Sequence, residues 1–337
     1  MKRTVDFRFR CIGWVAAVVF AGTGALGPAI AQAGKPSQAC ASTAQYTVVP
    51  LPFTPMLVTP SGVVAGITEL RRAVVWHRDS GVEELGVPEG FYFTEPVAVM
   101  PSGEVLINAF DARGDKRAAF TYSNHQFVAL TGKQTWVHGA GAPGMIVGEW
   151  VPQGGTTTDA VYWSDAVPHS IGLCCGGILK AVNRRGKMIG EAYDVRGHYH
   201  AFSWSPSDGQ HIIDPTHAYS SAVAINNAGH ILLQVGDEGY LYVTGRPTHL
   251  GLSGKGHTGV QALNDCDVVI GGYGQVAERY HAFVWSQAQG FKDLDSFPPA
   301  DSGWRFREAT AINDGGEIVG SGKWHGAKRG FLLIPQH

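Results

Sequence analysis

The segment ATAINDGGEIVGSG at Ala309–Gly322 decides the fold, because copies of it recur along the chain. Two short apolar runs flank an Asn/Asp/Gly cluster, which is the pattern of two strands joined by a tight turn. The clearest copies begin at Ala222 (AVAINNAGHILL) and Val260 (VQALNDCDVVIGG), and weaker ones begin at Ala181, Ala142, Ala98 and Leu57. The turn falls at Gly62, Gly103, Gly144, Gly186, Gly229, Asp267 and Gly316, at intervals of 41, 41, 42, 43, 38 and 49 residues. The chain therefore contains seven units of about 42 residues.

Each unit contains four short runs with the alternating or β-branched character of strands, which we name A to D in chain order. Examples are TAIN at Thr310 (A), GEIVG at Gly316 (B), HAFVW at His281 (C) and KDLD at Lys292 (D). A four-stranded sheet that repeats about every 42 residues is typical of a β-propeller blade. The sequence therefore predicts an all-β fold, a seven-bladed β-propeller with four-stranded blades.

The two ends of the repeat region complement each other. The seventh unit has strands A, B and C without a D strand, whereas residues 46–53 (YTVVPLPF) precede the first A strand and resemble an isolated D strand. Pairing the two would remove an exposed sheet edge. We therefore expect residues 46–337 to form one propeller domain, with residues 46–53 as the strand that closes the last blade.

The ATAINDGGEIVG and HAFVW segments resemble the HAF-repeat family of exported bacterial proteins. The resemblance covers roughly Tyr46 to Pro335 and is closest in the last four units, because the first three lack the HAF histidine and the AIN segment. It implies the repeat fold and export, and it brings no catalytic residue or ligand to this chain.

The first 33 residues have the pattern of a secretory signal peptide. Four basic residues in the first ten precede an apolar run from Cys11 to about Ile30, and Ala31-Gln32-Ala33 follows. A membrane anchor is the alternative, but glycines and Pro28 interrupt the run and favour cleavage after Ala33. We expect residues 34–45 to be a short linker. We expect the protein to be exported, periplasmic or secreted, with no membrane span after cleavage.

Composition narrows the classes of partner. Charged residues make up 16% of the chain and the net charge is −2, which gives no electrostatic reason to expect binding to nucleic acid or to an anionic membrane. Glycine, with 45 residues, is unusually frequent and evenly spread, as expected for a chain with many turns. We expect a monomer without a cofactor, apart from the metal site considered below.

The histidine of the HAF motif occupies a variable position at the head of strand C, which we name the C-head position. Its occupants in the seven units are Arg72, Ala118, Asp159, His200, Glu238, His281 and Arg329. A metal ring or a catalytic site would need particular side chains in particular units, whereas this set is only mostly polar. We therefore interpret the C-head residue as a solvent-edge position and the following Phe120, Phe202 and Phe283 as core.

Function in a propeller is carried by loops, because the strands are committed to packing. The B–C and D–A loops emerge on one face, which we name the B–C/D–A face. Glu149 and Glu191 occupy equivalent positions just after the B-strand glycine of adjacent units. Paired carboxylates can act as acid and base or hold a cation, so they are the candidate catalytic residues. A solvated polar rim is the simpler interpretation.

Aromatic and amide side chains gather on the same face, where such platforms stack on sugar rings or form protein interfaces. The candidate ligand-binding residues are Tyr92, Asn108, Trp136, Trp150, Tyr193, Tyr219, Trp304 and Trp324. We therefore predict a binding module for a glycan or for an envelope or extracellular protein. A polysaccharide lyase or hydrolase on this face and a structural scaffold are the alternatives.

Metal and disulfide sites are also indicated. His198 and His200 lie two residues apart with Glu191 on the preceding strand, and such a set can bind zinc or copper. Cys40 and Cys266 form a candidate disulfide that would fix the ring closure. Cys174 and Cys175 are either a vicinal disulfide or free thiols.

Overall fold

The computed structural model describes residues 45–131, 134–141, 144–151, 158–214, 216–251, 256–275, 280–299 and 301–336. All of them belong to one contact-defined unit, Gln38–His337. The predicted signal peptide and all of the predicted linker except Gln45 lie outside the described residues.

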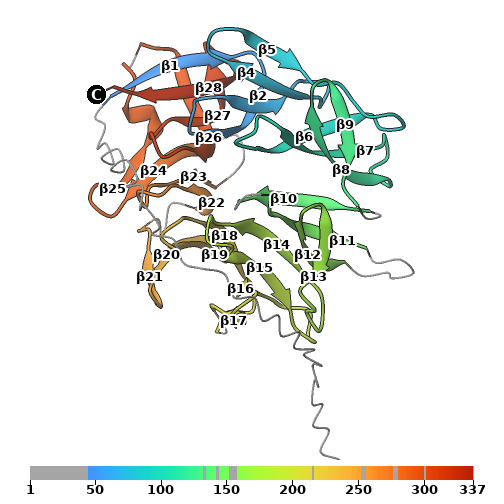
Figure 1. Cartoon of the computed structure of the whole chain (residues 1–337). Helices are drawn as coiled ribbons and strands as arrows, with labels where there is room; N and C mark the ends of the chain where they lie inside the picture. Colours follow the sequence, from blue (N-terminus) through green and yellow to red (C-terminus); the bar gives the residue numbers. More distant parts are fainter. Residues whose placement is uncertain are drawn as a thin grey trace, which may run out of the picture. The chain divides into compact units, whose positions relative to one another are not determined.

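Seven four-stranded antiparallel sheets form a seven-bladed β-propeller, as the repeat predicts (Figure 1). Blades one to three comprise β2 (Thr54–Val58), β3 (Val64–Ile67), β4 (Ala73–His77), β5 (Gly81–Glu84); β6 (Phe93–Val99), β7 (Val105–Phe110), β8 (Arg117–Ser123), β9 (Gln126–Ala129); and β10 (Trp136–Ala140), β11 (Ile146–Trp150), β12 (Asp159–Ser164), β13 (Val167–Ser170). Blades four and five comprise β14 (Gly177–Val182), β15 (Met188–Tyr193), β16 (Tyr199–Ser205), β17 (Gly209–Ile212); and β18 (Ser220–Ile225), β19 (Ile231–Val235), β20 (Glu238–Val243), β21 (Arg246–His249). Blade six comprises β22 (His257–Leu263), β23 (Val269–Gly274), β24 (His281–Ser286) and β25 (Gly290–Asp293), followed by the 3-10 helix η2 (Leu294–Ser296).

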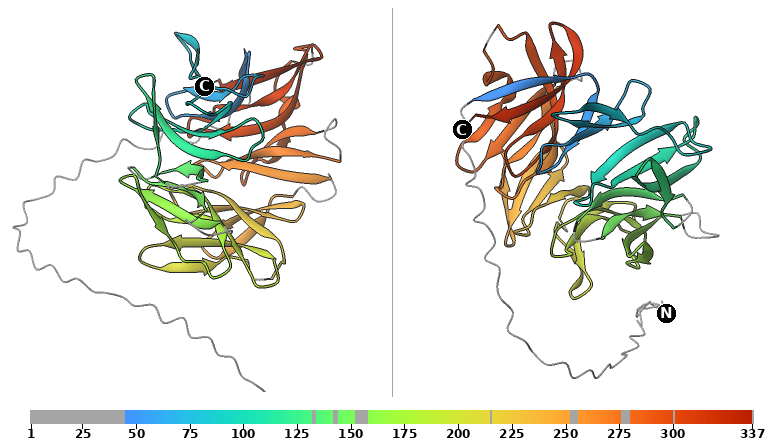
Figure 2. Two further views of the ribbon diagram at one scale, coloured as in Figure 1. Left: turned by 90° about the vertical axis from the view of Figure 1, so that its right-hand side faces the viewer. Right: turned by 45° about the horizontal axis from the view of Figure 1, so that its top comes forward.

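The seventh blade is closed by the N-terminal strand, as predicted. It consists of β26 (Trp304–Ile312), β27 (Ile318–Trp324), β28 (Ala327–Pro335) and β1 (Tyr46–Leu51). Strand β1 pairs along its whole length with β28, from Tyr46 opposite Pro335 to Leu51 opposite Gly330. The blue β1 lies beside the red β28 in Figure 1, and Figure 2 shows the first and last blades adjacent in the ring.

The seven turn positions found in the sequence have a left-handed backbone. The φ angles are +78° at Gly62, +88° at Gly103, +73° at Gly144, +76° at Gly186, +91° at Gly229, +57° at Asp267 and +79° at Gly316. Each residue ends the tight turn between strands A and B, where glycine adopts this backbone without steric cost and Asp tolerates it. The left-handed backbone required at this position therefore explains why the same residue type, mostly glycine, recurs there in each unit.

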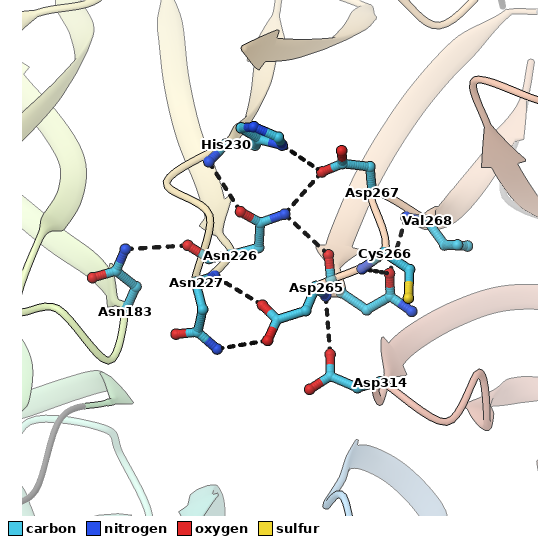
Figure 3. A network of polar contacts seen from close by, with 10 residues as sticks. Asn183, Asn226, Asn227, His230, Asp265, Cys266, Asp267, Val268 and Asp314 are labelled. Atoms are coloured by element: carbon cyan, nitrogen blue, oxygen red, sulfur yellow. Dashed lines mark hydrogen bonds and ion pairs between the residues drawn. The ribbon is translucent and has the colours of Figure 1, made fainter. Parts of the chain in front are cut away.

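Asparagine side chains connect successive A–B turns into a chain of hydrogen bonds (Figure 3). The Nδ2 atom of Asn183 donates to the carbonyl of Asn226, and Asn226 donates in the same way to Asn264. Asn264 donates to Asn313, and Asn313 donates to the carbonyl of Thr59 in blade one. Each Oδ1 also accepts backbone N–H groups of its own turn. The asparagines therefore fix the turn and tie each blade to the next.

The three successive positions of the HAF motif have different structural roles. The C-head residue lies at the sheet end, the following small residue is buried, and the phenylalanine is core: Ala201, Ala282, Phe202 and Phe283 are all 0% exposed. The small residue lies where the next blade approaches, since Ala201 N donates to Ser220 Oγ at the start of β18. The prediction that the aromatics of strand C are core is confirmed.

Every A strand contains a bulge that the repeat pattern does not predict. The extra residue lies six positions before the turn residue in each blade: Met56, Val97, His138, Lys180, Val223, Gln261 and Thr310. A bulged residue has no direct partner on the neighbouring strand, and its side chain is re-aimed. Three of these side chains reach other blades, since Lys180 donates to Ser221, Gln261 to Glu308 and Thr310 to the carbonyl of Pro55.

Candidate functional site

The C-head residue has a partner in most blades, diagonally across on strand D. Arg72 lies 3.4 Å from Glu84, Asp159 accepts a hydrogen bond from Ser170 at 3.3 Å, Glu238 lies 3.4 Å from His249, and His281 lies 3.4 Å from Asp293. Blade two has alanines, Ala118 and Ala129, at both positions. Diagonal neighbours on an antiparallel pair are within reach of long side chains. The C-head residue therefore belongs to a structural cross-strand pair in four blades, and blade two has two apolar residues in the same places.

Two blades break this pattern. In blade four the register places Ile212 diagonally opposite His200, and in blade seven it places Pro50 diagonally opposite Arg329. Neither side chain can pair with a polar C-head group. His200 and Arg329 are thus the two polar C-head residues without a polar partner on strand D. Both lie on the B–C/D–A face, where the sequence analysis expects function.

Around Arg329 the surface forms an open pocket of about 870 Å³ between blades seven and one. Its walls come from the β27–β28 hairpin, the connection between β1 and β2, and the β3–β4 loop. The residues that line it include four cationic ones, Arg307, Lys323, Lys328 and Arg329, and one acidic one, Glu69. Within the described part of the chain none of the four forms an ion pair. The pocket therefore carries an unneutralised positive charge.

Other groups in the pocket suit an oxygen-rich ligand. The hydroxyl groups of Thr54 and Ser321 lie in its lining, and neither makes a hydrogen bond within the described residues. Exposed Pro52 adds an apolar surface. Two further hollows, of about 290 and 530 Å³, lie near A–B turns on the opposite face of the ring.

The candidate catalytic carboxylates are buried and paired with cations. Glu149 and Glu191 are each 9% exposed. Glu149 lies 3.9 Å from Arg117, and Glu191 is hydrogen-bonded to Lys180 of the preceding strand. Burial raises the pKa of Glu149, and the charge of Arg117 opposes that rise. The solvated rim considered for these residues is wrong, because both side chains lie inside the protein in contacts with cations.

His138, a bulge residue that the sequence analysis did not single out, lies in the same charged cluster. Burial is the main cause that lowers the pKa of His138 to about 4. The charges of Lys180 and Arg117 lower this pKa further, and the charge of Glu191 opposes the shift. Its Nε2 atom is buried without a hydrogen-bond partner in the described structure. The imidazole is therefore neutral at physiological pH and retains an unused polar atom.

The predicted aromatic platform is dispersed. Tyr92 and Tyr219 are exposed, at 63% and 51%, whereas Trp304 is 4% exposed and stacks between Trp324 and Phe306. Trp324 is half-buried and its indole donates to the carbonyl of Ser302.

Three other members of the predicted set are partly buried. Trp136 packs against Phe110 and Arg117, Trp150 against the apolar cluster between blades two and three, and Tyr193 against Tyr199. A flat aromatic face does not form from these residues.

Asn108 is wrong as a ligand residue. It is 3% exposed, and its amide donates to the carbonyl of Val137 and accepts from the Val137 N–H. Both polar atoms are therefore used to connect blade two to blade three.

The metal prediction needs one correction. Asp194, His198 and His200 place one ligand atom each within 4.8 Å of the other two, and Glu191 is not part of this group. The reason is register: β15 and β16 pair Glu191 with Ala201 and Ala192 with His200, so Glu191 and His200 lie on opposite faces of the sheet.

The cysteines fall into two classes. Cys266 is disulfide-bonded, and Cys40, its predicted partner, lies outside the described residues, so the pairing stays a prediction. Cys174 and Cys175 are free thiols with their sulfur atoms 3.3 Å apart. Of the two alternatives considered for them, the structure therefore has the thiols.

Comparison with known proteins identifies the fold. No protein-family model and no curated protein matches the chain. Among solved structures, virginiamycin B lyase from Staphylococcus aureus is similar over 86% of this chain and 100% of its own, with a TM-score of 0.52 and 13% identity. The extracellular domain of a putative hybrid two component system from B. thetaiotaomicron gives a TM-score of 0.57 at 9% identity, over 87% of this chain and 40% of that one.

A third similar structure, a puromycin-hydrolyzing peptidase from Mycobacterium tuberculosis, gives a TM-score of 0.55 at 10% identity, over 87% of this chain and 52% of that one. At these identities the likeness shows a shared fold alone. The described residues contain no helix long and apolar enough to cross a bilayer.

Proposed function

We propose that the protein is an exported β-propeller binding module that recognises an acidic glycan on its B–C/D–A face. The observation that carries the proposal is the basic pocket between blades seven and one. It is a concave site of a size usual for ligand pockets.

The charge of the pocket selects for an anion. Four cationic residues line one cavity, and no ion pair within the described residues neutralises them. Arg307 comes from the innermost strand, where it also donates to the carbonyl of Tyr280, whereas Lys328 and Arg329 come from the outer hairpin. The cationic residues of the lining therefore come from three strands of blade seven, β26, β27 and β28. Guanidinium and ammonium groups bind carboxylate and sulfate through charge-assisted hydrogen bonds.

The rest of the pocket favours a sugar over other anions. Free hydroxyls at Thr54 and Ser321 match the hydroxyls of a sugar ring, and Pro52 offers a surface for its apolar face. The net charge of −2 for the whole chain argues against nucleic acid, because such binding draws on a broad positive field. A glycan bearing a uronate or sulfate group combines the features that the pocket can recognise.

A binding screen tests the proposal. Calorimetric titration with polygalacturonate, alginate and chondroitin sulfate is expected to detect binding to at least one of them, and dextran is expected not to bind. Substituting Lys328→Gln together with Arg329→Gln is expected to weaken binding at least tenfold. The matched control is Arg184→Gln with Arg185→Gln, the two exposed central residues of the blade-four A–B turn on the opposite face.

Three outcomes would contradict the proposal. They are equal losses in both double variants, equal affinity for dextran, and binding of DNA or anionic vesicles in preference to every acidic glycan. The HAF-repeat resemblance and export remain part of the proposal. Export is tested separately, by N-terminal sequencing of the protein recovered from the periplasm or the medium.

A lyase acting on the same glycans is the second candidate function, and the neutral His138 beside Lys180 favours it. A buried neutral imidazole can accept a proton, and a nearby cation can stabilise the resulting negative charge. Degradation of the acidic polymers that is lost in both Glu149→Gln and His138→Gln would support this activity. Degradation that survives Glu149→Gln, Glu191→Gln and His138→Gln would exclude the cluster as its site.

A further inference from the structure

Blade four carries the other unpaired C-head residue, His200. Its diagonal neighbour on strand D, Ile212, is apolar and 42% exposed. The imidazole instead meets the β15–β16 loop. Its Nδ1 atom is buried without a hydrogen-bond partner in the part of the chain that the structure describes. The fold therefore leaves one nitrogen of this imidazole without a hydrogen bond, while the other, Nε2, faces Asp194.

Three ligand-type atoms converge at this loop. Asp194 Oδ2 lies 3.3 Å from His198 Nδ1 and 3.6 Å from His200 Nε2. Ligands bound to zinc at about 2.0–2.1 Å in a tetrahedron lie roughly 3.3–3.4 Å from one another. The two distances are therefore close to those of a tetrahedral site before any ion is added.

Hydrogen bonds from the loop backbone to the second carboxylate oxygen of Asp194, Oδ1, hold this side chain in place. Asp194 Oδ1 accepts the backbone N–H groups of Arg196 and His198, at 2.8 and 3.0 Å. The main chain of Asp194 pairs with that of His198 and of Gly197. These bonds orient the side chain and leave Oδ2 directed at the two imidazoles. The ring of Tyr219 packs edge-on against His198, with the centroids 5.5 Å apart, and flanks the site on its exposed side.

A second cluster of a histidine and two carboxylates lies in blade six, and its contacts have a structural role. His281 also faces two carboxylates, Asp293 and Asp295, at 3.4 and 3.8 Å. There, however, Asp293 Oδ2 accepts the hydroxyl hydrogen of Tyr273 at 2.7 Å. His281 and Asp293 also occupy the C-head and strand-D positions whose side chains contact each other in three other blades. This cluster supplies one imidazole, whereas the blade-four loop supplies two.

We propose that Asp194, His198 and His200 form a binding site for a divalent transition metal, Zn²⁺ or Cu²⁺, with an open position on the B–C/D–A face. Two imidazoles and one carboxylate are a ligand set that these ions prefer. Three protein ligands leave a coordination position for water or for an oxygen atom of a bound molecule. The site lies in blade four and does not depend on the acidic-glycan pocket of blades seven and one.

Two free thiols must be removed before metal binding at this site can be measured. Cys174 and Cys175 lie in the loop before β14, which the hydrogen bond from Tyr193 N to the carbonyl of Gly176 connects to the end of β15. Thiolates bind the same metals. The test therefore uses the full chain with Cys174→Ser and Cys175→Ser as its background.

Calorimetric titration of the chelator-treated background protein with Zn²⁺ is expected to give one equivalent bound with a dissociation constant in the micromolar range or below. Co²⁺ in place of Zn²⁺ is expected to give the intense visible absorption of a tetrahedral site. Asp194→Asn and His198→Asn are each expected to weaken binding at least tenfold. His281→Asn is the matched control and is expected to leave binding unchanged. Thermal unfolding of every variant without metal checks that the fold is retained.

The proposal is overturned if the background protein binds no Zn²⁺ or Cu²⁺, or if His281→Asn removes binding as His198→Asn does. It is also overturned if binding survives in both Asp194→Asn and His198→Asn. His198 is partly exposed at the end of a loop, so its substitution leaves the core intact and keeps the test decisive.

Discussion

A small residue follows the C-head position in all seven blades: Ala73, Ala119, Ala160, Ala201, Gly239, Ala282 and Gly330. The adjoining chain approaches closely at this position. A Cβ atom added to Gly330 would lie 2.2 Å from the backbone oxygen of Phe53. The HAF motif thus combines a solvent-edge polar group, a close approach between neighbouring segments and a core aromatic ring in three successive residues.

Substituting Gly330→Ala is expected to lower the free energy of unfolding by about 1–3 kcal/mol, because the new methyl group meets backbone that cannot move away. Gly239→Ala is the matched control. An added Cβ there meets only the side chains of Val260 and Leu250, which can shift, so the loss should be smaller. Urea unfolding of both variants makes the measurement, and an equal loss in the two would contradict this explanation of the motif.

His138 gives the protein a defined pH dependence. Its pKa is about 4 in the folded protein, mainly through burial, and about 6.5 in the unfolded chain. Between these values the unfolded chain binds a proton that the folded protein does not. The free energy of unfolding therefore falls as the pH drops from 6.5 towards 4, by up to about 1.4 kcal/mol per pH unit from this residue. Substituting His138→Gln is expected to reduce that slope, measured by urea unfolding across the window; an unchanged slope would contradict the buried neutral imidazole.

At the scale of the element, the A–B turn and the A-strand bulge form one unit with a fixed spacing of six residues. The turn asparagine fixes the hairpin and donates to the next turn, while the bulge residue supplies a side chain that can reach another blade. Blades two and three carry Met100 and Gly141 where blades four to seven carry asparagine. The asparagine chain therefore spans blades four to seven and ends on Thr59 of blade one.

Substituting Asn264→Ala is expected to lower the free energy of unfolding by about 2–4 kcal/mol. The N–H groups of Cys266 and Val268 would lose their acceptor, and the carbonyl of Asn313 would lose a donor. Gln287→Ala, an exposed change without a described side-chain hydrogen bond, serves as control and should stay within about 0.5 kcal/mol of the parent. Equal stability of the two variants would show that the asparagine chain contributes nothing.

At the scale of the whole molecule, the ring is closed by residues from opposite ends of the sequence. Leu51 and Phe53 pack with Val64 and Val74 of blade one and with Val319 and Leu332 of blade seven. The same junction supplies walls of the basic pocket. Closure and the proposed binding site therefore depend on one segment.

A chain beginning at Gln45 is expected to fold, whereas a chain beginning at Thr54 lacks β1 and leaves the edge of β28 unpaired. Exposed strand edges promote association. The shorter chain should unfold at a lower urea concentration and form aggregates in size-exclusion chromatography. Identical behaviour of the two chains would contradict the role given to β1.

The sequence was sufficient for the fold but not for the site, and the reasons are physical. Glycine at a left-handed turn and the small residue of HAF are local requirements, so they recur visibly in each unit. The basic pocket joins Glu69, Arg307 and Lys328, which are distant in sequence and share no repeat position. The ligands of the candidate metal site could not be chosen without the strand register. Ala192 pairs with His200, and this pairing places Glu191 on the face of the sheet opposite to His200.

Crystallography of the protein with a bound acidic trisaccharide, such as trigalacturonate, tests the central claim most directly. Difference density is expected between blades seven and one, with a carboxylate of the sugar within hydrogen-bond distance of Lys328, Arg329 or Arg307. Density for the sugar elsewhere, or an empty pocket at saturating ligand, would contradict it.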